Sequence, residues 1–200
     1  MRTLGLLVVV LALVAISTRA RADSFAELAG GLAIPASDDN WTKLVGASPK
    51  LAARGGSMSG ELGGMLGVDW TPESLDNGGG SSGLGSTAGS LQRFRVLASG
   101  VIRHRITPTL TVGGRAGAGI DIAHASYDVT LLGTTTSGSD TDVGYAFEFG
   151  VGLWVDVGTK QVGVELAVPF GHHDKPAQQS GDLPFQWTSI DVDLLVGVRF

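Results

Sequence analysis

The final stretch of the sequence, residues 188–200, alternates in polarity from one residue to the next. One set of alternate residues, which ends at Phe200, is almost wholly apolar, while the other set carries Asp191, Asp193 and Arg199. A period of two is the signature of an extended strand, because successive side chains point to opposite faces of a sheet. The chain therefore contains a strand with one apolar and one charged face, and the fold depends on which face meets water.

Seven earlier stretches alternate in the same way, namely 24–34, 50–58, 61–71, 91–102, 110–123, 143–155 and 161–170. Each is close to the roughly 9–11 residues that a tilted membrane strand uses. The connections are long at 35–49, 72–90, 126–142 and 171–186, and short at 59–60, 103–109 and 156–160. Alternation of long and short connections is typical of an up-and-down barrel. We therefore predict an all-β fold, an eight-stranded antiparallel up-and-down transmembrane β-barrel.

The beginning of the chain predicts a secretory signal peptide. A charged start at Arg2 precedes an apolar run over residues 4–16, and Ala20-Arg21-Ala22 is a small-x-small cleavage site. The apolar run is shorter than the roughly 20 residues of a spanning helix. We expect residues 1–22 to be removed and residues 23–200 to form one barrel domain, with no further domain after it.

Composition excludes several classes of protein. There is no cysteine, so disulfides, thiolate metal sites and a lipoprotein anchor are excluded. Three of the 14 basic residues (Arg2, Arg19, Arg21) would leave with the signal peptide, which changes the net charge from −5 to −8. An acidic chain is a poor partner for nucleic acid.

The charged face of the strands also holds small residues, among them Gly31, Gly67 and Gly150. Only 16% of the chain is charged, which is little for the exterior of a soluble barrel. The interior of an eight-stranded barrel is just wide enough for side chains to fill it, and glycines leave room for long ones. A basic residue facing lipid at mid-membrane would cost about 2–4 kcal/mol. The apolar face is therefore expected to meet lipid, and the charged face to line the lumen.

A set of charges on the inward face is predicted to form a network of ion pairs that plugs the lumen: Glu27, Arg54, Asp69, Arg93, Arg95, Arg115, Asp121, Glu148, Glu165, Asp191 and Asp193. Lys50, Glu61 and Arg199 fall on the same face by phase. Four apolar residues also fall on it, namely Leu97, Val101, Trp154 and Leu195.

Three features of the sequence together resemble a known family of proteins. The signal peptide, the eight amphipathic strands and the terminal Val196-Gly-Val-Arg-Phe200 look like the small outer-membrane β-barrel proteins, the group of OmpX and the OmpA membrane domain. The resemblance implies a Gram-negative cell outer membrane, a porin-like barrel, and Phe200 as the assembly signal that the barrel-assembly machinery recognises. It also implies contact with outer-membrane lipid and lipopolysaccharide.

One pair of residues suggests catalysis. His124 and Ser126 share the outward face near the outer rim, and they resemble the His-x-Ser of the lipid A deacylase barrels. There a histidine activates a serine for attack on an acyl ester. The orienting acid would be Asp128, Asp140 or Asp142, while Tyr127 stands where that family has an asparagine. Lipid A acyl-ester hydrolysis is therefore an alternative function.

The favoured function is non-catalytic, a structural or surface-interaction role with the lumen plugged and the outer loops in contact with the surroundings. A narrow small-solute channel is a second alternative. We expect a monomer without cofactor, metal or nucleic-acid partner. His172-His173-Asp174 is interpreted as a solvated loop rather than a metal site, since adjacent side chains in an extended segment diverge.

Overall fold

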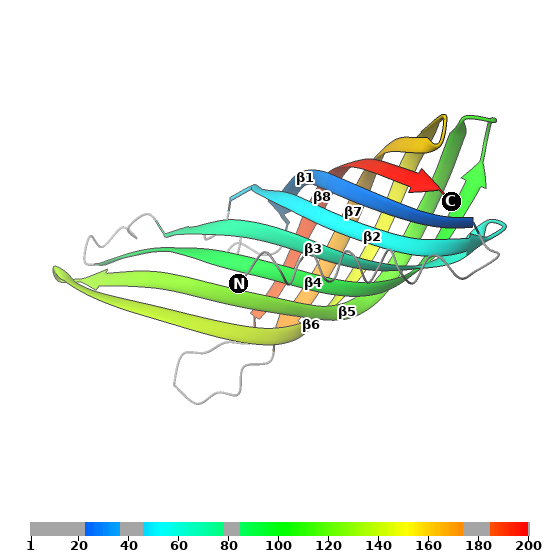
Figure 1. The fold of residues 1–200 in the computed structure, drawn as a ribbon. Helices are drawn as coiled ribbons and strands as arrows, with labels where there is room; N and C mark the ends of the chain where they lie inside the picture. The colour runs from blue at the N-terminus through cyan, green and yellow to red at the C-terminus, as the bar shows by residue number, and fades with distance from the viewer. Residues whose placement is uncertain (1–22, 37–45, 78–84, 174–184, 200) are drawn as a thin grey trace.

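The structure, a computed structural model, describes residues 23–36, 46–77, 85–173 and 185–199. These segments form eight strands: β1 (Asp23–Pro35), β2 (Ser48–Ser59), β3 (Leu62–Asn77), β4 (Gly85–Arg105), β5 (Leu110–Leu131), β6 (Thr134–Val157), β7 (Lys160–His173) and β8 (Phe185–Arg199). Each strand pairs antiparallel with the next, and β1 pairs with β8, so the barrel is closed (Figure 1). The predicted fold class is confirmed. Among the described residues, no helix is long and apolar enough to cross a membrane.

One end of the barrel, called here the turn end, carries the three short connections. Gly60 lies in the turn between β2 and β3, and Gly158 lies in the turn between β6 and β7; their φ angles are 67° and 65°. The positive φ is the reason that glycine occupies these positions. The first and last strands also meet at this end, where Phe25 pairs with Arg199.

The opposite end differs from the sequence prediction. Residues 126–142 were expected to form a loop, but β5 and β6 continue through most of this segment as a paired hairpin. The hairpin turns at Leu132 and Gly133, which have φ angles of 49° and 82°. Two consecutive positive φ values fit the twist of a two-residue hairpin turn. The expected loop 72–90 is likewise shortened, because β3 continues to Asn77 and β4 begins at Gly85.

The two faces of the wall alternate as predicted. On β1, Leu28 is 62% exposed and its neighbour Ala29 is 5% exposed. Exposed apolar side chains occur on every strand from β1 to β8, so the outside of the barrel is a hydrocarbon-like surface. The placement of Glu61 on the inward face is wrong. Glu61 lies in the β2–β3 turn and is exposed, because β3 begins only at Leu62.

The apolar residues predicted to face inward are buried and fill the lumen towards the turn end. Val101 packs with Phe25, Met58 and Met65. Leu195 and Trp154 pack with Ala29 and Ala52 in a second cluster, and Leu97 is buried as well. These apolar residues therefore form a layer near the turn end. Much of the polar interior lies between this layer and the opposite end of the barrel.

Candidate functional site

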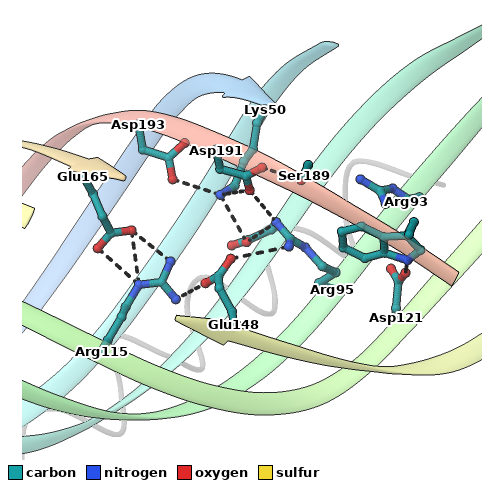
Figure 2. Close-up of polar contacts among 12 residues, drawn as sticks. Lys50, Arg93, Arg95, Arg115, Asp121, Glu148, Glu165, Ser189, Asp191 and Asp193 are labelled. Atoms are coloured by element: carbon teal, nitrogen blue, oxygen red, sulfur yellow. Dashed lines mark hydrogen bonds and ion pairs between the residues drawn. The ribbon is translucent and has the colours of Figure 1, made fainter. Parts of the chain in front are cut away.

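The interior of the barrel holds a compact group of charges, called here the central cluster: Lys50, Arg54, Arg95, Arg115, Asp69, Glu148, Glu165, Asp191 and Asp193. All nine side chains are buried. They come from seven strands, and Figure 2 shows those that it labels pointing toward one another across the lumen. Formally the cluster contains four cations and five carboxylates, so the ionised cluster carries one negative charge in excess.

Lys50 of β2 reaches past β1 to β8, the other neighbour of β1 in the closed barrel. Its Nζ lies 2.7 Å from Asp191 Oδ2 and 2.9 Å from Asp193 Oδ2, both on β8. Asp69 Oδ2 of β3 lies 3.6 Å away. A single ammonium group thus links three strands, which a flexible point charge with three donors can do.

Arg95 of β4 lies beside Lys50 and shares two of its carboxylates. Its Nη2 donates to Asp69 Oδ2 at 2.9 Å and to Asp191 Oδ2 at 3.1 Å. Its Nη1 lies 3.4 Å from Glu148 Oε2 of β6. Asp69 and Asp191 therefore each lie between two cations, and removal of Lys50 or Arg95 would leave each of them with one.

Arg54 and Arg115 both pair with Glu165 of β7. Arg54 Nη1 donates to Glu165 Oε1 at 2.8 Å, and its Nη2 donates to Asp193 Oδ2 at 3.0 Å. Arg115 donates to Glu165 through Nε and Nη2, at 3.1 and 2.9 Å to Oε1, and also pairs with Glu148. These contacts connect β2, β5, β6, β7 and β8 across the bore.

The loop-facing end of the lumen has its own polar group. Arg93 pairs with Glu73 at 2.7 Å, and its guanidinium lies 3.7 Å from the ring centroid of Trp187. Trp187 Nε1 donates to Asp121 Oδ2 at 2.8 Å. His173 places Nε2 2.9 Å from the same carboxylate, and Nδ1 lies 3.1 Å from Asp142.

The turn end is closed by an arginine between two rings. The Arg103 guanidinium lies 4.4 Å from the ring centroids of both Phe25 and Trp154. Arg103 also pairs with Glu27. A guanidinium that stacks on aromatic faces and pairs with a carboxylate is stabilised by both kinds of contact.

Glycines make room for these long side chains. A Cβ on Gly150 would lie within 3.4 Å of both Arg115 and Glu165, and one on Gly67 would lie 3.3 Å from Arg54 Cγ. At Gly171 a Cβ would overlap the indole of Trp187. The inward glycines of the sequence therefore correspond to the positions over which charged or aromatic side chains lie.

Pairing offsets the cost of burying these charges. Each ion loses several kcal/mol of hydration free energy in a protein interior. This loss is offset only when the ion-pair geometry is good and further hydrogen bonds are made. Most central carboxylates meet two or more cations. The arrangement can hold the lumen closed, and its several shared partners make it stiff.

The structure brings together the charges selected from the sequence. All eleven of them are buried, and each takes part in an ion pair or hydrogen bond with an oppositely charged or polar partner. Their partners include residues that were not selected, namely Lys50, Glu73, Arg103, His173, Trp187 and Ser189. Lys50 had been placed on the inward face but left out of the network. Phe200, the expected assembly signal, lies outside the described residues.

His124 and Ser126 are separated by one residue on β5, and Ser126 is exposed. His124 Nδ1 lies 2.7 Å from Thr141 Oγ1 on β6. Of the three candidate acids, Asp142 contacts His173, while Asp128 and Asp140 pair in register with Ser137 and Ala125. His124 Nδ1 therefore contacts the hydroxyl group of Thr141.

Comparisons with known proteins gave matches in structure but not in sequence. No family model matches the chain, and no curated protein is significantly similar to it in sequence. Among solved structures, a major outer membrane protein from Thermus thermophilus matches with a TM-score of 0.58 and 15% identity, over 90% of this chain and 100% of that one.

Two further structures are similar. OprG, an outer membrane protein of Pseudomonas aeruginosa, matches with a TM-score of 0.53 and 11% identity, over 90% of this chain and 96% of that one. Ail, the attachment invasion locus protein of Yersinia pestis, in complex with the heparin analogue sucrose octasulfate, matches with a TM-score of 0.52 and 14% identity, over 90% and 100%. At these identities the similarity concerns the fold alone.

Proposed function

We propose that this chain, which has the fold of the small outer-membrane β-barrel proteins, is a non-catalytic outer-membrane barrel with a lumen plugged by ion pairs. The observation that carries the proposal is the central cluster, in which buried charges from seven strands pair across the bore. Such a lumen offers no open path for solutes. The role that remains is to support the membrane and to contact the surroundings.

The contact surface is the paired hairpin of β5 and β6 at the end opposite the short turns. Its turn carries Leu132, which is 78% exposed, and Tyr127 on β5 is also exposed. A stiff hairpin with exposed apolar side chains is suited to contact another surface. We further propose a Gram-negative cell, signal peptide cleavage after Ala22, insertion by the barrel-assembly machinery through the C-terminal strand, and a monomer surrounded by phospholipid and lipopolysaccharide.

The first test is electrophoretic. The mature chain, refolded in detergent micelles, should migrate differently before and after boiling, because a closed barrel resists unfolding by detergent. A chain that stays monomeric and folded in plain buffer without detergent would contradict the membrane placement.

The second test measures conductance in planar bilayers. The wild-type barrel should give no discrete ion-selective current. The double variant Arg54→Ala/Glu165→Ala removes three ion pairs, namely Arg54–Glu165, Arg54–Asp193 and Arg115–Glu165. Asp193 keeps Lys50 and Arg115 keeps Glu148. The conductance of the double variant should rise, because two long side chains leave the bore. A selective unitary current in the wild type would favour the channel alternative.

The third test concerns catalysis. The contact of His124 Nδ1 with Thr141, rather than with a carboxylate, supports a non-catalytic role. Purified barrel incubated with lipid A should release no fatty acid. Release that is abolished in Ser126→Ala would overturn the proposal in favour of acyl-ester hydrolysis.

A further inference from the structure

The outer wall of the barrel has a groove of about 930 Å³ near the turn end. Its floor includes Gly100 of β4 with Gly114 and Ala116 of β5, and its sides include Ile102 and Phe149. Gly100 and Ala116 are direct partners in the β4–β5 register, so the small residues lie side by side. The volume falls within the range of about 300–1,000 Å³ that is common for sites of small ligands.

The groove exists because the floor lacks side chains. A Cβ on Gly100, or on its partner Gly64 of β3, would meet no atom within 4 Å. These glycines therefore open outward, unlike the inward glycines that make room for the lumen charges. Among the residues lining the groove, Arg115 is the one charged residue, and its side chain points into the lumen toward Glu165. An apolar groove in a wall that faces hydrocarbon is suited to an acyl chain.

A pair of exposed polar side chains, His104 and Glu61, lies directly beyond the groove at the turn end. His104 follows the groove residue Ile102 on the same face of β4, and Glu61 precedes the groove residue Leu62. The Arg103 amide donates to the Glu61 carbonyl at 2.8 Å, which holds the two segments together. His104 Nδ1 lies 2.6 Å from Glu61 Oε1, and the side chains are 62% and 59% exposed.

This pair complements a zwitterionic headgroup. The contact joins His104 Nδ1 to Glu61 Oε1 and does not involve Nε2 or Oε2. In the imidazolium form both ring nitrogens donate, and Nε2 can donate to a phosphate oxygen. Glu61 Oε2 can accept from a primary ammonium group. The end of the groove therefore offers one donor and one acceptor beside an apolar trough.

We infer that the groove holds one phospholipid with a primary-ammonium headgroup, its acyl chain over Gly100 and its headgroup on the His104–Glu61 pair. The inference rests on the proposed function only for the presence of a surrounding membrane. A barrel that is heat-modifiable in detergent but retains no lipid contradicts this inference alone.

The experiment is native mass spectrometry of the mature barrel in detergent micelles, titrated with phosphatidylethanolamine. The wild type should retain one lipid per barrel. Gly100→Leu should weaken retention about tenfold or more, the equivalent of about 1.4 kcal/mol. The matched control is Gly30→Leu on the outward face of β1, where a new Cβ meets Leu51 Cδ2 at an ordinary 3.7 Å.

The headgroup contact is tested with a second variant and a second lipid. Glu61→Gln should abolish any preference for phosphatidylethanolamine over phosphatidylcholine, which has no ammonium N–H to donate. Equal retention by Gly100→Leu and Gly30→Leu would overturn the inference. A dimer that Gly100→Leu converts to monomer, with no bound lipid, would overturn it as well and assign the groove to a second copy of the chain.

Discussion

Two neighbours on β8 show how differently the two faces of the wall are stabilised. Asp193 points inward, is 1% exposed, and contacts Lys50 and Arg54 of β2. Leu194 points outward and is 65% exposed. The inward residue depends on partners far away in the sequence, whereas the outward residue depends only on being apolar. An inward position such as Asp193 therefore requires a particular charged residue, whereas an outward position such as Leu194 requires only an apolar one.

The largest expected effect breaks the inward side of this comparison. Lys50→Met leaves Asp191 and Asp193 without their ammonium partner and doubles the formal negative excess of the central cluster. Removal of one partner from a buried pair costs about 3–5 kcal/mol. The free energy of unfolding should fall by about that amount in urea titrations of the barrel folded in micelles.

The matched control for Lys50→Met is the double variant Lys50→Met/Asp191→Asn. It returns the formal excess of the central cluster to one negative charge, so its loss of stability should be smaller than the sum of the two single losses. A single variant that loses less than about 1 kcal/mol, as exposed pairs do, would mean that water reaches the cluster.

The second effect tests the outward side. Leu194 lies in the middle of the outward apolar row of β8, between Val192 and Val196. Leu194→Arg should lower the free energy of unfolding by about 2–4 kcal/mol if that position lies at mid-membrane. The measurement is the same titration in lipid bilayers, with Leu194→Met as control. Equal stability of the Arg and Met variants would place this face in water.

The smallest effect compares two adjacent leucines. Leu195→Ala empties space beside Trp154 and Ala52, so it loses the transfer free energy of the side chain and leaves a cavity, about 2–5 kcal/mol in total. Leu194→Ala should lose only the transfer free energy of the side chain, because lipid chains would fill the space that the side chain leaves. Unfolding titrations should show Leu195→Ala to be less stable than Leu194→Ala by about 1–2 kcal/mol. The opposite order would contradict the assigned faces.

The fold and the inward charges could be predicted because a barrel strand alternates with a period of two throughout. Asp69 and Arg95 were assigned correctly without any knowledge of the register that makes them direct partners. The ion-pair partners themselves could not be predicted. Lys50 and Asp191 are separated by 141 positions, and only closure of the barrel brings them together.

Apart from Lys50 and Ser189, which lie within the predicted strands 50–58 and 188–200, the missed residues lie just beyond the predicted strand ends. The alternation that includes Arg93 and Arg95 continues to Arg103, and the one that includes Asp69 continues to Glu73. Prolines and glycines nearby are typical of loops and obscure the continuation of the alternation in the sequence. His173 and Trp187 were missed for the same reason, since both extend an inward row of β7 or β8.

Closure by β1 and β8 has a consequence for assembly. The two strands lie at opposite ends of the described chain, so a nascent wall keeps two open margins until the final strand arrives. Each margin exposes a ladder of unbonded amides and carbonyls, and every such group costs several kcal/mol in hydrocarbon. For the membrane placement proposed above, joining of the seam would therefore have to accompany entry into the bilayer.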